Sequence, residues 1–108
     1  MTILIAGPDV EGLTDALVAL DADVVRVEGI ATRESLDAAG LAEAHTLVLT
    51  DMDDASAIPV AKEANAEIRV VTYARESLPE FARGQADLAI DPALLSPDVV
   101  ADELLGGA

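Results

Sequence analysis

Short runs of Val, Ile and Leu alternate with helical patterns along the 108 residues, and this alternation constrains the fold more than any other feature. Runs that are apolar throughout are typical of parallel strands buried on both faces. The predicted strands are Thr2–Ala6, Asp23–Glu28, Thr46–Thr50, Ile68–Tyr73 and Asp87–Ile90. Right-handed crossovers between such strands place helices on both sides of the sheet. We therefore predict an α/β fold, a Rossmann-like, three-layer, doubly wound parallel sheet of five strands in the order 2-1-3-4-5.

Helices are predicted between the strands from apolar spacing, capping residues and stop signals. They cover Val10–Leu20, Ser35–Ala39 behind a Thr32 cap, Ala55–Asn65, Ser77–Arg83, and Val99–Leu105 behind Ser96-Pro97-Asp98. A chain of this length is expected to form one domain. We place that domain at residues 1–105, with 106–108 as a frayed tail.

The first strand leads into a glycine turn that is similar to a nucleotide-binding loop with one position altered. The pattern GxGxxG needs three glycines, and the chain has Gly7, Asp9 and Gly12 at those positions. This predicts a cofactor-binding loop formed by Gly7, Pro8, Asp9, Val10 and Gly12, although the Asp9 carboxylate repels phosphates. The alternative is a strand-to-helix turn that needs glycine only for its backbone geometry, with Asp9 as an N-cap.

Polar residues follow the second and third predicted strands, whose carboxyl ends should meet the glycine turn at the switch point of the sheet. Glu28 is placed to accept the hydroxyls of an adenosine ribose, and Thr50 and Asp51 complete the predicted cofactor site. Asp51, Asp53 and Asp54 are candidate ligands for Mg²⁺ or K⁺, because hard cations prefer oxygen. The alternatives are a solvated strand end at Glu28 and a solvated acidic loop that caps the next helix.

The charge balance excludes several classes of partner. The chain has 21 Asp and Glu against 6 Lys and Arg, a net charge of -15, and no cysteine. No basic patch is present to bind nucleic acid or an anionic membrane, and disulfides and thiolate metal sites are excluded. Acid spread along every segment with almost no lysine indicates a salt-rich, halophilic cytoplasm, where ions screen the self-repulsion. Without a signal-peptide pattern or a membrane-spanning run, we expect a cytoplasmic protein.

From Ala31 onward the chain resembles the TrkA-N domain, the nucleotide-binding lobe of RCK regulators of potassium channels and transporters. The resemblance rests on residues 31–41, 42–50, 51–56, 68–74 and 84–92, together with Gly7 and Gly12. It implies a regulatory module that binds NAD(H) or an adenine nucleotide and signals through a homodimer or a transporter or regulatory protein. Three departures from the family are Asp9, a strand–helix unit that is missing near Asp23–Ile30, and the absence of an effector lobe.

Two other functions stay open. One is a degenerate Rossmann-like protein-interaction domain that has kept the fold but no longer binds a nucleotide or any other cofactor. The other is a receiver-like signalling domain, with Asp51 at the end of the third strand and Thr72 near the end of the fourth. Receivers need an acidic pair after the first strand and a lysine before a proline after the fifth; this chain has Gly7-Pro8-Asp9 and Asp91-Pro92 instead. An enzyme is not expected, because no nucleophile–base pair is visible.

Overall fold

The computed structural model describes residues 2–8, 12–27, 29–51, 54–74 and 86–106, and it contains one parallel sheet. The sheet has five strands in the order β2-β1-β3-β4-β5, which confirms the predicted fold class and strand order. The strands are β1 Thr2–Ala6, β2 Asp23–Val27, β3 Thr46–Leu49, β4 Arg69–Tyr73 and β5 Leu88–Ile90. Each agrees with its predicted run to within one residue at either end.

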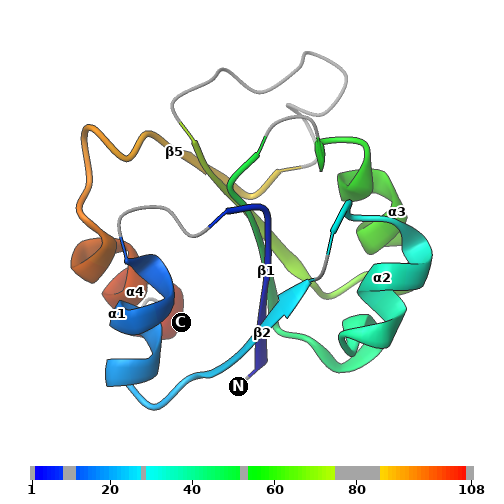
Figure 1. Cartoon of the computed structure of the whole chain (residues 1–108), viewed down its shortest axis with the longest axis horizontal. Coiled ribbons are helices and arrows are strands. Elements are labelled where there is room, and N and C mark those ends of the chain that lie inside the picture. The colour runs from blue at the N-terminus through cyan, green and yellow to red at the C-terminus, as the bar shows by residue number, and fades with distance from the viewer. Residues whose placement is uncertain (1, 9–11, 28, 52–53, 75–85, 107–108) are drawn as a thin grey trace.

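The helices cover both faces of the sheet, as predicted. They are α1 Leu13–Ala19, α2 Arg33–Ala38, α3 Ala57–Ala64 and α4 Pro97–Gly106, with a short 3-10 helix, η1 Leu41–Glu43. Figure 1 shows α1 and α4 on one side of the sheet and α2 and α3 on the other. The predicted helix Ser77–Arg83 lies outside the described residues. No helix in the described ranges is long and apolar enough to cross a membrane.

The inner strand β1 shows why the inner strands of the sheet are largely apolar. Ile3 and Ile5 pack into the cluster formed with α1 and α4, whereas Leu4 and Ala6 pack into the cluster formed with α2 and α3. All four side chains are fully buried. Alternate residues of a strand point to opposite faces, so a strand covered on both sides needs apolar residues at every position. Each fully buried Ile or Leu contributes about 1.5–3 kcal/mol to folding.

Two predicted local signals are also present. Thr32 caps α2, and its side chain accepts a hydrogen bond from the backbone N–H of Ser35 while the Ser35 side chain bonds back to Thr32. Pro97 is the first residue of α4, a position where its missing N–H costs no helical hydrogen bond. The two signals mark the starts of α2 and α4.

The one lysine of the chain holds the amino edge of the sheet together. Lys62, on α3, donates to the Asp87 carboxylate at 2.7 Å and to the Ile68 carbonyl at 2.9 Å. The same carboxylate oxygen accepts the backbone N–H of Val70 at 2.7 Å. Burial by itself raises the pKa of Asp87, but these two hydrogen bonds and the charges of Lys62 and Arg69 outweigh it, and the pKa is lowered.

We predict that Asp87→Ala destabilises the protein at neutral pH by about 1 kcal/mol, because it removes two charge-assisted hydrogen bonds that are partly screened by solvent. Since the folded-state pKa is lowered, the contribution is complete above the ordinary value of 3.8 and disappears as the pH falls through the folded-state value. Urea denaturation as a function of pH measures it. Asp37→Ala, which breaks only the exposed Arg33–Asp37 pair, is the control and should change stability little. Equal losses in both variants would contradict this account.

Candidate functional site

A pocket of about 580 Å³ lies at the carboxyl edge of the sheet. It is formed where the loops after β1, β2 and β3 meet, which is the predicted switch point of this strand order. Its lining residues are Gly7, Pro8, Arg26, Val27, Gly29, Ile30, Asp51 and Asp54. The position follows from the topology, because parallel strands bring their carboxyl ends, and so their loops, to the same edge.

The loop after β1 is held against the end of β3 by Thr50. The Thr50 hydroxyl donates to the carbonyl of Pro8 at 2.6 Å and also lies 3.3 Å from the carbonyl of Ala6. The backbone N–H of Thr50 continues the sheet by donating to the same Ala6 carbonyl at 3.0 Å. Thr50 is almost fully buried, so these contacts replace the water that its polar groups have lost.

Gly7 is required by this contact. Its φ of +103° lies in a region that side chains with a Cβ rarely adopt, and a Cβ here would overlap the Thr50 hydroxyl and approach the backbone N of Asp51 to 3.1 Å. Packing of the loop against β3 therefore explains the glycine without any bound phosphate.

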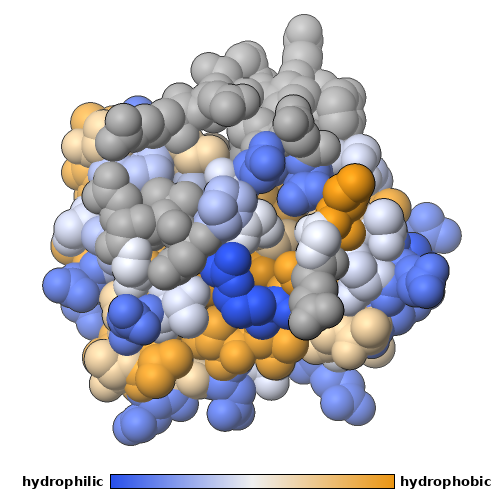
Figure 2. Space-filling model, in the orientation of Figure 1, coloured by the Kyte–Doolittle hydropathy of each residue, from blue (hydrophilic) through white to orange (hydrophobic). Residues whose placement is uncertain are grey.

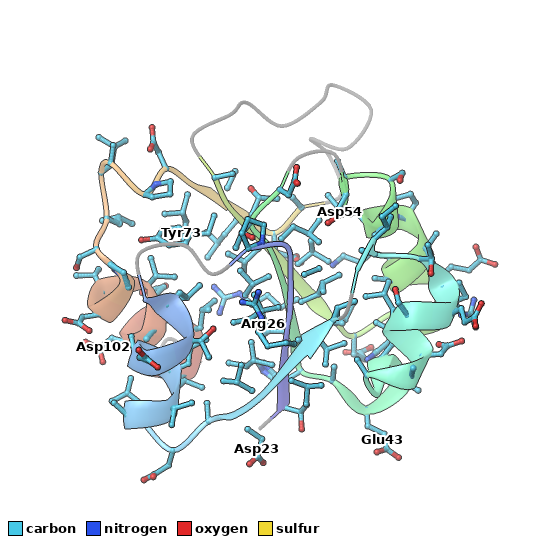
Figure 3. The ribbon with its side chains drawn as sticks, in the orientation of Figure 1. Asp23, Arg26, Glu43, Asp54, Tyr73 and Asp102 are labelled. Carbon is cyan, nitrogen blue, oxygen red and sulfur yellow. The ribbon has the colours of Figure 1, made fainter. Side chains whose placement is uncertain are left out.

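Arg26 supplies a positive charge to the pocket. Its guanidinium donates a hydrogen bond to the carbonyl of Gly7 at 2.6 Å, although the side chain is exposed. Figure 3 shows Arg26 in front of β1, with Asp54 nearer the carboxyl ends of the strands. Sequence reasoning missed Arg26, and the available signal was a charged residue among the valines near the carboxyl end of β2.

Asp54 is the most buried acidic residue in the described part of the chain, with 8% of its surface exposed. Its Oδ1 accepts a hydrogen bond from the backbone N–H of Ala31 at 3.2 Å, which joins the β3–α3 loop to the β2–α2 loop. Asp51, three residues earlier, is half-buried and lines the same pocket. The pocket therefore has two carboxylates on its β3 side and one guanidinium on its β2 side.

The structure brings part of the predicted site together. The pocket is lined by the predicted residues Gly7, Pro8, Asp51 and Asp54. Thr50 holds the loop after β1 in place through its hydrogen bond to the Pro8 carbonyl. Gly12 does not line the pocket: it precedes α1 with φ +82° and its carbonyl accepts the N–H of Ala16. The other predicted residues, Asp9, Val10, Glu28 and Asp53, lie outside the described residues. Among described residues, no group of three or more His, Cys, Asp or Glu could hold a metal ion.

We predict that Gly7→Ala destabilises the protein by at least about 1 kcal/mol more than Gly40→Ala, because overpacking adds to the backbone strain. Gly40 is the matched control, with φ +96° and nothing within 4 Å of an added Cβ. The backbone strain alone costs roughly 1–2 kcal/mol in either variant. The double variant Gly7→Ala/Thr50→Ala should recover part of the loss, since it removes the overlapping hydroxyl. Equal losses for the two glycines in urea denaturation would show that the overlap is absent.

The fold is similar to that of solved proteins over nearly the whole chain. The orphan response regulator HP1043 of H. pylori matches with a TM-score of 0.77 and 17% identity, covering 98% of this chain and 94% of that one. A pilus assembly-related protein of Burkholderia pseudomallei matches with a TM-score of 0.68 and 20% identity, covering 96% and 86%. The pilus assembly protein CpaE of Burkholderia thailandensis matches with a TM-score of 0.67 and 20% identity, covering 96% and 94%. At these identities the likeness establishes a receiver-like fold.

These matches correct the resemblance to the TrkA-N domain. The TrkA-N, nucleotide-binding and potassium-transport interpretation is wrong, because the family match and the structural matches cover nearly the whole chain and point elsewhere. The region Asp23–Ile30 supplies β2 and its loop, so a receiver-like order of five strands is complete without a missing unit. The cofactor expectation, NAD(H), an adenine nucleotide or none, rested on this resemblance and stays a prediction.

A comparison with curated proteins finds no match. Residues 3–104 match the model of the family of unknown function DUF7126, and the chain therefore belongs to that family.

Proposed function

We propose that this chain is a receiver-like protein-interaction domain that works without phosphoryl transfer. The observation that carries the proposal is the carboxylate of Asp91, which precedes Pro92 where a receiver has its lysine. The Oδ1 of Asp91 accepts a hydrogen bond from the backbone N–H of Ala93 at 2.8 Å. This side chain is held in its own turn after β5, and it supplies no positive charge to the carboxyl edge.

Phosphoryl transfer to Asp51 would need positive charge to balance the charge that develops on the phosphoryl oxygens. Lys62, the only lysine, is bonded to Asp87 at the opposite, amino edge of the sheet. Arg26 lines the pocket, but one of its terminal nitrogens is bonded to the Gly7 carbonyl. Of the described residues, no other cationic side chain lines the pocket. This charge distribution supports a site that has no phosphotransfer chemistry.

Catalysis of another kind finds little support in the pocket. The only histidine, His45, has its Nδ1 2.7 Å from the Thr46 hydroxyl at the amino end of β3, and it does not line the pocket. A general base must lie within hydrogen-bond reach of the proton that it removes, which His45 does not for a ligand in this pocket. We therefore propose that the domain is not an enzyme.

A regulatory protein is the partner that we propose. The similar solved structures are described as an orphan response regulator and as pilus-assembly proteins, so proteins with this fold occur in signalling and in assembly. This support is by analogy of fold, since one fold serves many functions. A homodimer is the alternative partner, and the oligomeric state measured by light scattering separates the two.

We predict that incubation with acetyl phosphate and Mg²⁺ leaves the protein unmodified. The reason is that Asp91, where a receiver has its lysine, precedes Pro92 and is held in its own turn after β5. Intact-mass spectrometry measures the result, with a phosphorylatable receiver treated in parallel to show that the donor is active. A phosphorylated Asp51 would overturn the proposal, and Asp51→Asn would identify the modified residue by losing the modification.

We also propose that the domain works in a salt-rich cytoplasm. Figure 2 shows hydrophilic residues interspersed with hydrophobic ones at the left, right and lower edges of this face, and the whole chain has a net charge of -15. At 1 M salt the screening length falls to about 3 Å, which removes most repulsion between exposed carboxylates. The melting temperature should therefore rise steeply between dilute buffer and molar KCl. A melting temperature that is independent of KCl would contradict this location.

A further inference from the structure

The carboxylate of Asp54 is the most buried charged group that lines the pocket. It is 92% buried, and within the described part of the chain it accepts one hydrogen bond, from Ala31 at 3.2 Å. An ionised carboxylate has about four acceptor sites, and burial without a paired cation or several donors is costly. Asp54 lines the pocket, so a positive group that enters the pocket can pair with this carboxylate in place of solvent.

The other walls of the pocket define what such a ligand looks like. Asp51 lies on the same side as Asp54, whereas Arg26 lies on the β2 side with donors beyond the one that Gly7 uses. Ile30 lines the pocket and is 76% exposed, which offers an apolar surface to an aliphatic chain. A peptide with a basic side chain matches all three features. Its cation reaches the carboxylates, its methylene groups contact Ile30, and its backbone carbonyls accept hydrogen bonds from Arg26.

The charge of the whole chain favours the same ligand. A net charge of -15 attracts a basic segment at long range and repels an acidic one. The chain itself has a single lysine, which is committed to Asp87, and it has Asp91 where a receiver has its lysine. A cation at this edge of the sheet is therefore more readily supplied by a partner than by this lysine.

We infer that the pocket at the carboxyl edge is the docking site for a basic segment of the partner protein, with an arginine or lysine side chain held by Asp54 and Asp51. This inference rests on the proposed function, and it names the partner's chemistry. The receiver-like fold thus keeps an acidic pocket, and a second protein supplies the cation that pairs with Asp54 and Asp51.

The test uses NMR titration of the isotope-labelled full chain with acetyl-Gly-Arg-Gly-amide. The matched control peptide has citrulline in place of arginine, which keeps the shape and removes the charge. We expect saturable shifts of the amides of Gly7, Gly29 and Ala31 with the arginine peptide only. Asp54→Asn should weaken binding at least about tenfold, because the buried partner of the cation is lost. Asp51→Asn, at a more exposed position, provides a second variant if Asp54→Asn unfolds.

Asp102→Asn is the matched control variant, since it changes the net charge equally at an exposed position on α4. It should leave the affinity unchanged. The inference is overturned if Asp102→Asn weakens binding as much as Asp54→Asn, if the citrulline peptide binds equally well, or if the shifts spread over the acidic surface. Shifts of the same amides by Mg²⁺ alone would identify a metal site instead. The proposed function fails if Asp51 is phosphorylated, whereas this inference fails if the peptide does not bind as described. The two failures are therefore measured separately.

Discussion

Burial of the sheet on both faces is the constraint on which the rest of this structure depends. With helices on either side, β1, β3 and β4 bury nearly all of their side chains, and Ile3, Leu4, Ile5 and Ala6 of β1 are fully buried. Charged side chains are thereby moved from the inner strands to the edges of the sheet. The amino edge is closed by Lys62 and Asp87, whereas the carboxyl edge is left with the pocket.

The carboxyl edge is built from contacts that serve packing first. Thr50 fixes the loop after β1, Gly7 allows that approach, and Asp54 joins two neighbouring loops through Ala31. Each contact satisfies a polar group that folding removes from water. Besides these contacts, the edge has charged groups that line a pocket of about 580 Å³, namely two carboxylates and one guanidinium. The proposed binding of a basic segment depends on these charged groups.

The fold could be predicted because its signals are repeated along the chain. Runs such as Thr2–Ala6 and Thr46–Leu49 are apolar at every position after the first threonine, a pattern typical of burial on two faces. The site was harder to predict because its signals are single residues. A glycine before a helix suits a phosphate loop and a packed turn equally well, and the overlap with Thr50 that requires Gly7 joins residues far apart in sequence. Arg26 was missed because its bond to Gly7 depends on strand order.

The same ambiguity explains why the family assignment failed while the fold prediction succeeded. Strand–glycine–helix openings and acidic loops after β3 occur wherever a parallel sheet has a switch point, so they identify an edge and not its ligand. The residues that discriminate are the charged residues at this edge of the sheet. Asp91 in the place of a lysine removes a cation, and Asp54 retains a buried carboxylate that lines the pocket. Two carboxylates beside one guanidinium leave the pocket acidic, and this charge favours a basic segment of a partner protein.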